Sequence, residues 1–282
     1  MRNILKLMFT MICLSGVFII PAFSCTMVMV AKDDIILAGN NEDWKNPETR
    51  MWVYPASKSE YGRVCFGFDD GYTQGGMNDQ GLFIDGNALA PTGWKPSPGK
   101  PYFRGNLMDH ILAHCATVDE AANFFREYNF PSLENAKFPI ADAKGDSAVI
   151  EWGQGKVQVL KRSGRYQIST NFVQSNYSQK NYPCDRYKMA EKILAAANNV
   201  SIDLVRSVLS ATHNEYSYPT LYSNIYDLKN KKVYLYNFHN FEEVVVIDLA
   251  KELKIGKMTY KIPDLFFVKT QAARLFERHL RK

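Results

Sequence analysis

Short apolar runs separated by polar turns dominate the first part of the chain, and they predict β-strands. Apolar and β-branched residues fill residues 26–31 and 35–38 on either side of the polar turn 32–34, a pattern typical of a hairpin. Further strand patterns follow, separated by turns that contain glycine or aspartate. These predicted strands lie at residues 51–54, 63–68 and 82–86.

The spacing of apolar residues then becomes helical. Leu107, Ile111 and Leu112 fall on one helical face, and Thr117 with Glu120 forms a capping box before the next helix. Strand patterns return at residues 147–152, 156–160, 166–170, 221–227, 232–237 and 244–247, and helices are predicted at 186–197, 201–211 and 272–280. Because strands and helices arrive in separate blocks, we predict an α+β fold of antiparallel sheets with helices layered outside them.

Residues 1–24 have the pattern of a secretory signal peptide. The basic residues Arg2 and Lys6 come before an apolar stretch at residues 7–20. Pro21 ends this stretch, and the small residues Ala22 and Ser24 follow. The stretch is shorter than the ~20 residues that span a bilayer, so we predict export to the periplasm or outside the cell, without stable membrane insertion after cleavage. Cleavage after Ser24 would leave Cys25 as the N-terminus.

A lipoprotein pathway is the alternative for the same segment, and it would attach lipid to Cys25. The preceding residues match a lipoprotein box poorly, because alanine stands three positions before the cysteine and bulky Phe23 two before. The lipoprotein interpretation therefore ranks second.

Composition narrows the function classes. The formal net charge of +5 falls to +3 when Arg2 and Lys6 leave with the leader, which is too weak and dispersed to predict nucleic-acid binding. The chain is 46% hydrophobic and lacks a Pro/Gly/Ser-rich linker, so residues 25–282 are predicted to form one domain.

The cysteines and histidines predict neither a disulfide scaffold nor a metal site. Once Cys13 leaves with the leader, Cys25, Cys65, Cys115 and Cys184 remain, and no C-x-x-C spacing occurs. His110 and His114 stand four residues apart on a predicted helix, which is ligand spacing, but no third ligand is evident. We therefore predict no metal and no cofactor.

An N-terminal Cys25 would carry a thiol and an α-amine on one residue. The ordinary pKa of an α-amine is about 7.7–8.0 and that of a thiol about 8.5, so near neutral pH part of the amine is neutral and can accept the thiol proton. Such a residue suits acyl transfer from an amide to sulfur, followed by hydrolysis of the thioester.

Several segments in order resemble one known family. They are Cys25-Thr26, GNNEDW (residues 39–44), GMNDQGL (76–82), DAKGDSAVIE (142–151), STN (169–171) and DRY (185–187). The set, which covers the chain from Cys25 to about Asp248, resembles the choloylglycine hydrolase and penicillin V acylase group of N-terminal-nucleophile hydrolases. The resemblance implies a four-layer αββα sandwich.

The resemblance also implies roles for particular residues. Cys25 would be the nucleophile and, through its amine, the base, and Asp43 would hold the α-ammonium. Asn171 would donate to the oxyanion. Arg186 would lie near the thiol and favour the thiolate.

The resemblance also bears on two further positions. A second oxyanion donor follows the GMNDQGL segment in the family. A strict count reaches Ala88, so we take the neighbouring asparagine, Asn87, as the candidate. Asn40 stands where these hydrolases usually have an arginine, which removes a positive charge beside the thiol and puts the family's substrate preferences in doubt.

We therefore predict an exported thiol amidohydrolase that cleaves linear C–N amide bonds of a small N-acyl substrate. An acyltransferase that uses the same acyl-enzyme is the first alternative, and a non-catalytic lipoprotein the second; an oligomer is possible. Loops at residues 46–55 and 91–102, with Trp52, Trp94 and Tyr102, are predicted to form an apolar acyl pocket.

Overall fold

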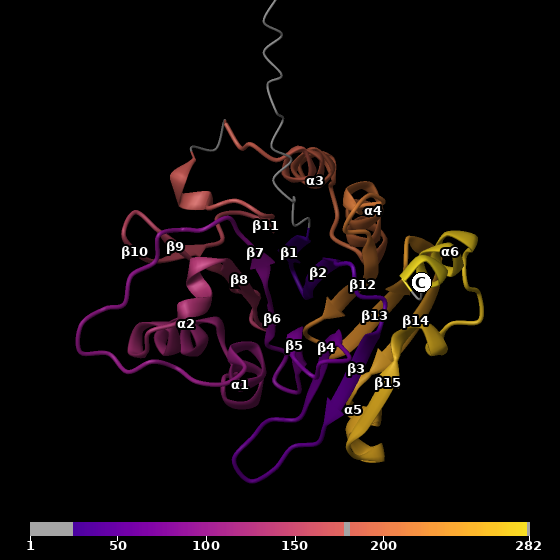
Figure 1. Cartoon of the computed structure of the whole chain (residues 1–282), viewed down its shortest axis with the longest axis horizontal. Helices are drawn as coiled ribbons and strands as arrows, with labels where there is room; N and C mark the ends of the chain where they lie inside the picture. The colour runs from indigo at the N-terminus through magenta and orange to yellow at the C-terminus, as the bar shows by residue number, and fades with distance from the viewer. Residues whose placement is uncertain (1–24, 178–180, 281–282) are drawn as a thin grey trace, which may run out of the picture.

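Two antiparallel β-sheets enclose the central core of the protein (Figure 1). In this computed structural model residues 25–177 and 181–280 are described, so the predicted signal peptide and Cys13 lie outside the described residues. One sheet has six strands, in the order β11 (Tyr166–Ser169), β1 (Thr26–Lys32), β2 (Ile35–Asp43), β12 (Thr220–Asp227), β13 (Lys232–Asn237) and β14 (Asn240–Asp248).

The second sheet has nine strands. Its main path runs β10 (Lys156–Lys161), β9 (Ser147–Gly153), β8 (Ala136–Ala141), β6 (Phe83–Asp85), β5 (Thr73–Asn78), β4 (Arg63–Phe68), β3 (Thr49–Tyr54) and β15 (Met258–Lys261). The short strand β7 (Asn87–Ala88) pairs with β8 beside β6.

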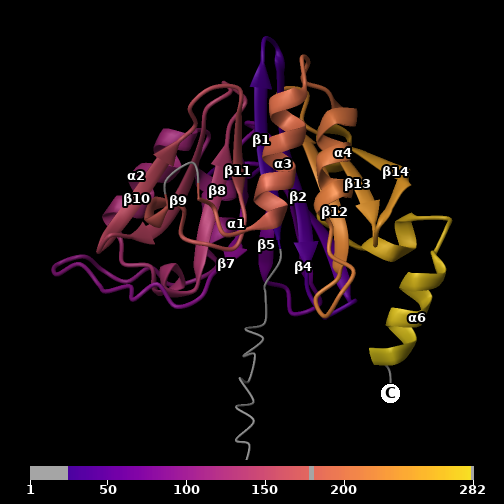
Figure 2. The ribbon, with the colours of Figure 1, turned by 90° about the horizontal axis from the view of Figure 1, so that it is seen from above.

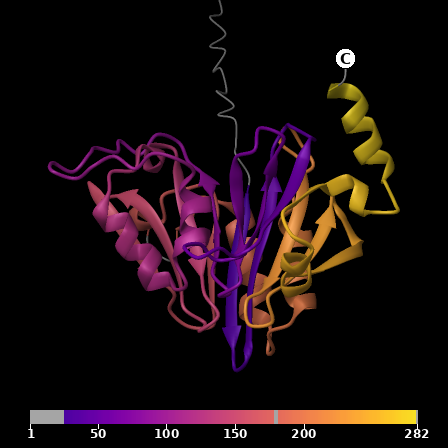
Figure 3. The ribbon, with the colours of Figure 1, turned by 90° about the horizontal axis from the view of Figure 1, so that it is seen from below.

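Helices cover the outer face of each sheet and complete four layers. Helices α1 (Leu107–His114) and α2 (Val118–Glu127) contact the nine-stranded sheet, whereas α3 (Asp185–Ala196) and α4 (Ile202–Thr212) lie side by side over β1, β2, β11 and β12 (Figure 2). The shorter elements are η1 (Pro131–Glu134), η2 (Gln174–Asn176), α5 (Leu249–Ile255) and η3 (Ile262–Leu265). Helix α6 (Gln271–Leu280) stands at the β14 end, apart from the layered helices (Figure 3). Within the described residues, no helix combines the length and apolarity needed to cross a bilayer.

Both faces of strand β1 are buried, which explains why its sequence is an unbroken apolar run. Side chains alternate between the two faces of a strand. Met27 and Met29 enter the core between the sheets, while Val28 and Val30 enter the core beneath α3 and α4. Each fully buried aliphatic side chain contributes about 1.5–3 kcal/mol of transfer free energy, so this hairpin strand is anchored from both sides. The predicted four-layer αββα fold is confirmed.

The structure adds strands that the pattern did not predict. Strand β5 contains Gly75 and Gly76, because a Cβ on Gly75 would lie 2.3 Å from Asp85 Oδ2 and one on Gly76 would lie 2.2 Å from the Val64 carbonyl oxygen. Strand β8 contains Pro139, which pairs with Val149 of β9 and lies between the part of β8 that pairs with β6 and the part that pairs with β7. Because glycine and proline interrupt the alternation of apolar and polar residues, the sequence pattern did not predict β5 and β8.

Candidate active site

Cys25 lies directly before β1, at the floor of a cavity of about 430 Å³. The residue is 6% exposed. The cavity is lined by Cys25, Glu42, Asp43, Trp44, Phe68, Asp70, Tyr72, Gln74, Gly86, Ala88, Leu89, Leu107, Met108, Ser132, Asn135, Ala136 and Phe138. Its walls are therefore largely apolar, with carboxyl groups gathered near the thiol.

Two side chains from distant segments hold the backbone carbonyl of Cys25. Asn87 Nδ2 donates to the Cys25 carbonyl oxygen over 3.1 Å, and Arg186 Nη1 donates to the same oxygen over 2.9 Å. Arg186 Nη1 also reaches Thr26 Oγ1 at 2.8 Å, and Nη2 reaches Asn171 Oδ1 at 3.0 Å. The Arg186 guanidinium thus links Cys25 to Thr26, the first residue of β1, and to Asn171.

The two asparagines differ in how fully their amides are used. Asn87 is fully buried; its Nδ2 contacts Cys25 O and Met27 Sδ, and its Oδ1 accepts from Ser169 Oγ at 2.5 Å. Asn171 Nδ2 donates to Ala88 O at 2.9 Å while its Oδ1 accepts from Arg186. Because an amide nitrogen carries two hydrogens, Asn171 retains one N–H beyond these bonds.

Asp43 ends β2 beside Cys25 and is 2% exposed. Its backbone hydrogen-bonds with the Cys25 thiol. Its side-chain Oδ1 accepts from Thr220 Oγ1, which in turn accepts from the Asn214 backbone N–H at 2.8 Å. Thr220 is a functional candidate that the sequence analysis missed, because no motif marks a threonine so far along the chain.

Buried carboxyl groups dominate the electrostatics near the thiol. Burial raises the pKa of the Cys25 thiol well above its ordinary value, and the nearby carboxyls of Glu42, Asp43 and Asp85 raise it further. Burial also raises the pKa of Glu42 well above its ordinary value and that of Asp85 to about 8. Both causes favour the neutral thiol over the thiolate.

Asn40, the position where the family usually has an arginine, faces one of these carboxyls. Its Nδ2 donates to Asp85 Oδ2, and its Oδ1 is buried without a hydrogen-bond partner among the described residues. An amide at this position therefore stabilises Asp85 by a hydrogen bond rather than by a full opposite charge, which is consistent with the raised pKa of that carboxyl.

A buried ion pair braces the segment that follows Asn171. Lys137 Nζ and Glu151 Oε2 lie 3.8 Å apart and both side chains are fully buried. Lys137 donates to the Phe172 carbonyl oxygen at 2.7 Å, and Glu151 accepts from the backbone N–H groups of Gln174 and Ser175. Sequence reasoning included Glu151 in a family segment but missed Lys137, whose partner lies on another strand.

Other motif residues maintain the fold around the site. Asn78 of the GMNDQGL segment donates to the carbonyl oxygens of Leu112 and Cys115 and accepts from the Leu82 N–H, which closes a tight turn against α1. Asp142 accepts from the N–H of Val118 at the start of α2. These two residues position elements and do not reach the cavity.

The predicted acyl pocket is wrong. Neither loop 46–55 nor loop 91–102 contributes to the cavity at Cys25. Trp52 lies in the core between the nine-stranded sheet and its helices, and Trp94 packs against Tyr102 and Trp152. Alternation along β3 sends Trp52 to the face away from Cys25, and burial against neighbouring rings accounts for Trp94.

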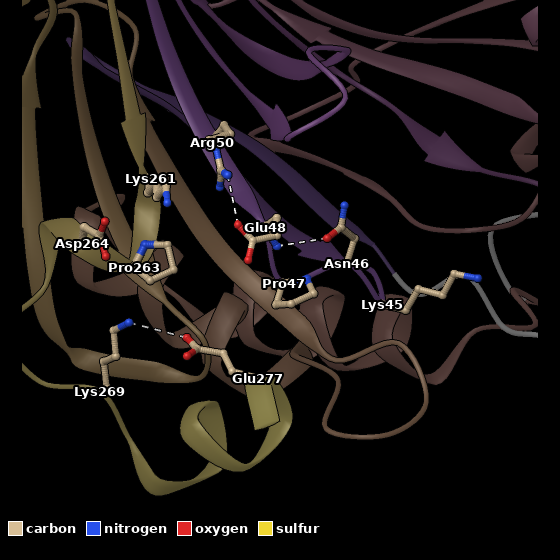
Figure 4. A pocket seen from close by; sticks show the side chains of 10 residues that line it. All are labelled: Lys45, Asn46, Pro47, Glu48, Arg50, Lys261, Pro263, Asp264, Lys269 and Glu277. Atoms are coloured by element: carbon tan, nitrogen blue, oxygen red, sulfur yellow. Dashed lines mark hydrogen bonds and ion pairs between the residues drawn. The ribbon is translucent and has the colours of Figure 1, made fainter. Parts of the chain in front are cut away.

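A second, larger cavity of about 580 Å³ lies between the start of β3, η3 and α6 (Figure 4). Four of its charged residues form two ion pairs: Arg50 with Glu48 at 3.0 Å, and Lys269 with Glu277 at 3.7 Å. It contains no cysteine, serine or histidine. Its volume therefore does not make it a stronger candidate than the cavity at Cys25.

The four cysteines of the described residues are free. Cys65 and Cys115 are buried and Cys184 is partly buried, as predicted for structural thiols. Burial raises the pKa of the Cys65 thiol to about 12 and that of Cys115 to about 11, so both thiols are neutral at physiological pH. Cys25 differs from them in lining a cavity.

One curated relative is similar to about half of the chain. Penicillin V acylase from Pectobacterium atrosepticum is 28% identical over 172 residues, which cover 49% of this chain and 46% of that protein, so the chain spans about half the length of the curated relative it matches.

Two solved structures share the fold over nearly their whole length. Penicillin V acylase from Agrobacterium tumefaciens has a TM-score of 0.68 at 21% identity, covering 84% of this chain and 91% of that one. A mutant of conjugated bile acid hydrolase from Clostridium perfringens has a TM-score of 0.70 at 16% identity, covering 88% and 99%.

One family model matches most of the chain. The model described as acyl-coenzyme A:6-aminopenicillanic acid acyl-transferase matches residues 30–241, which include Asp43, Asn171 and Arg186. With the shared fold and the ordered motifs, this match fixes the family. The chain belongs to the acyl-coenzyme A:6-aminopenicillanic acid acyl-transferase family, within the predicted choloylglycine hydrolase and penicillin V acylase group of N-terminal-nucleophile hydrolases.

Proposed function

We propose that this protein is an exported cysteine amidohydrolase that cleaves linear C–N amide bonds of small N-acyl substrates. One observation carries the proposal: Asp43, Asn87 and Arg186 come from separate segments and hydrogen-bond to Cys25, which lines a cavity, while Arg186 also holds Asn171. A structural role for Cys25 alone would not require this convergence.

The reaction would start from the neutral thiol. With residues 1–24 removed, the free α-amine of Cys25 takes the thiol proton as sulfur attacks the amide carbonyl carbon. The carbonyl C=O bond becomes a C–O⁻ single bond, and the remaining N–H of Asn171 donates to that oxygen. Asp43 holds the resulting α-ammonium, which then protonates the leaving amine as the C–N bond breaks. Water hydrolyses the thioester and regenerates the thiol.

Asn87 has a positioning role in this proposal rather than that of an oxyanion donor. Its amide hydrogens are directed at Cys25 O and Met27 Sδ, and its side chain has no exposed surface. Arg186 likewise holds the Cys25 carbonyl and orients Asn171. Each therefore fixes the geometry of a reacting group, which is how preorganised sites lower barriers.

The cavity lining supports an apolar acyl group. Phe68, Leu89, Leu107 and Phe138 supply apolar walls around Cys25. The relatives are named for penicillin V and conjugated bile acid, and those names support an N-acyl amide as the substrate class. Asp70 at the same cavity gives a polar group that could orient the amine side of such a substrate.

Acyl transfer to an amine is the second candidate, because the description of the matching family names an acyl-transferase. The two activities share one acyl-enzyme and differ in what attacks the thioester. Adding increasing concentrations of an amine acceptor separates them. A hydrolase continues to release free acid, whereas a transferase shifts the acyl group to the acceptor at low acceptor concentration.

The test is an assay of the chain that begins at Cys25 against a panel of N-acyl amides, compared with the precursor that retains residues 1–24. We expect activity only in the chain with a free α-amine, because an amide nitrogen is neither basic nor able to pair with Asp43. N-terminal mass spectrometry of the exported protein should find unmodified Cys25. A lipidated Cys25, or an active precursor, would overturn the proposal.

A further inference from the structure

A cluster of two histidines and a glutamate lies away from the cavity at Cys25. His213 follows the end of α4, Glu215 lies in the loop after it, and His239 lies in the turn between β13 and β14. One ligand atom from each side chain lies within 4.8 Å of the other two. The sequence analysis missed this cluster, because it weighed only the His110 and His114 pair.

The hydrogen bonds of His213 leave two acceptors facing each other. Its Nδ1 lies 2.5 Å from the Ser210 carbonyl oxygen, which can only accept, so Nδ1 carries the proton. In the neutral ring Nε2 is then a lone pair, and it lies 2.8 Å from Glu215 Oε1. Two acceptors at this distance need a cation between them, either a proton or a metal ion.

His239 adds a third acceptor to the same place. A hydrogen bond joins its ring to the backbone of Asn214, and its Nε2 is buried without a hydrogen-bond partner among the described residues. The bond to Asn214 therefore uses Nδ1, and Nε2 remains as a lone pair. A proton shared by His213 and Glu215 would leave His239 unsatisfied, whereas a metal ion would satisfy all three groups.

The arrangement fits the chemistry of zinc. Zinc takes histidine nitrogens at about 2.0–2.1 Å and carboxylate oxygens at about 2.0–2.2 Å, which sets tetrahedral ligand atoms about 3.3 Å apart. The Glu215 side chain is 67% exposed and can rotate to close the remaining gap. Metal-bound histidines usually donate their other N–H to a carbonyl or carboxylate, as the ring nitrogens here do toward backbone.

We propose that His213, Glu215 and His239 bind one Zn²⁺ or a similar divalent transition-metal ion, with water at the fourth position, and that the ion fastens the loop after α4 to the β13–β14 turn.

The backbone conformation of the β13–β14 turn is consistent with a His239 side chain that is fixed by a bound ion. Phe238 and His239 have φ values of 40° and 61°, and neither is glycine. Left-handed backbone at such residues costs on the order of 1–3 kcal/mol each and persists where the surroundings fix it. The turn places His239 opposite His213, with ring centroids 4.9 Å apart.

The fastened loop also supports the cavity at Cys25. The Asn214 N–H donates to Thr220 Oγ1 at 2.8 Å, and Thr220 donates to Asp43. The Trp44 N–H donates to the Pro219 carbonyl oxygen at 3.2 Å, and the rings of Trp44 and Tyr218 lie 5.8 Å apart. The metal site itself does not rest on the proposed amidase activity, so the two can fail independently.

Zinc titration calorimetry on the untagged chain starting at residue 25 tests the site. The titration is made in the Cys25→Ala background, because an N-terminal thiol and amine can chelate zinc on their own. We expect one equivalent to bind, and Glu215→Gln and His239→Gln to weaken binding at least about 100-fold, since loss of an outer partner alone costs about 10–100-fold. Zinc should raise the melting temperature of the parent but not of Glu215→Gln.

The double variant His110→Gln/His114→Gln is the matched control, because those rings lie 4.4 Å apart on α1 and His110 stacks on Phe124. It should bind zinc as the parent does. Absence of zinc binding by the parent, equal binding by all variants, or loss of binding only in the control would each overturn the proposal. Glu215 is exposed, so Glu215→Gln keeps the test valid if a histidine variant fails to fold.

Discussion

The cavity of Figure 4 and the cavity at Cys25 differ in charge environment more than in size. The cavity of Figure 4 is larger, about 580 Å³ against about 430 Å³, yet it contains two partly exposed ion pairs, Arg50 with Glu48 and Lys269 with Glu277. The cavity at Cys25 has apolar walls and gathers buried carboxyls around a thiol. Desolvation, which shifts pKa values, is therefore the better indicator of chemistry here than volume.

The same comparison separates structural from reactive polar groups. Glu48 has 45% of its side chain exposed beside Arg50, so solvent screens the pair. Asp85 is buried and accepts hydrogen bonds from Asn40 and the Gly86 N–H, and burial raises its pKa to about 8. Variants in the cavity at Cys25 should consequently change kcat or the pH dependence of stability, whereas variants in the cavity of Figure 4 should change only the unfolding free energy, by a small amount.

The largest expected effect is on catalysis and comes from Cys25→Ala. On the proposed mechanism this change removes the nucleophile, and loss of a nucleophile lowers kcat by about 10⁴-fold or more. Turnover of the best N-acyl amide measures it, with circular dichroism as a check on folding. Cys115→Ala, which removes a buried thiol outside the cavity, should retain activity; equal loss in both variants would contradict the role of Cys25.

Asn171→Ala should have the next largest effect. Removing one preorganised oxyanion donor lowers kcat by about 10²–10³-fold, with little change in KM. Steady-state kinetics on the same substrate give both constants. Asn46→Ala is the control, since Asn46 lines the cavity of Figure 4 and bonds to Asp69 at 2.9 Å. A kcat for Asn171→Ala within a few fold of the parent would remove Asn171 from the oxyanion site.

Asp85→Asn should change how stability depends on pH. The folded pKa of about 8 exceeds the ordinary value of 3.8, so between these pH values the folded state holds a proton that the unfolded state has released. Stability therefore falls as pH rises from about 4 to 8 and levels above pH 8.

The substitution removes this contribution and flattens the slope. Asn40 has a free buried Oδ1, so turning its amide lets it accept from the new side-chain amide. Urea unfolding at pH 5, 7 and 9 measures the difference. A parent and variant with parallel pH profiles would show that Asp85 is charged in the folded protein at neutral pH.

The smallest effect is expected in the larger cavity. Glu48→Gln breaks the partly exposed ion pair with Arg50, and such pairs contribute about 0.2–1 kcal/mol. The unfolding free energy should change by no more than this, and kcat should stay the same. A large loss of activity in Glu48→Gln would show that the cavity of Figure 4 takes part in the reaction and would end the contrast between the two cavities.

The sequence by itself determined the turns and helix caps, because these depend on residues close together in the chain. The turn at residues 32–34 joins β1 and β2 as predicted, and Thr117 caps α2 by accepting from the Glu120 N–H. The chemistry available to an N-terminal cysteine is also local, because it depends on one residue. The ordered motifs fixed the family, since each preserves a short backbone or site feature that can be recognised in isolation.

Tertiary structure alone decided which groups meet around Cys25. Thr220 contacts Asp43 across 177 positions of sequence, and Lys137 reaches the carbonyl after Asn171 from another strand. Strand alternation places Trp52 in the core on the face of β3 away from the cavity at Cys25. Burial, which raises the pKa values of Cys25 and Asp85, is likewise a property of neighbours distant in sequence, so no periodicity or motif within one segment could determine it.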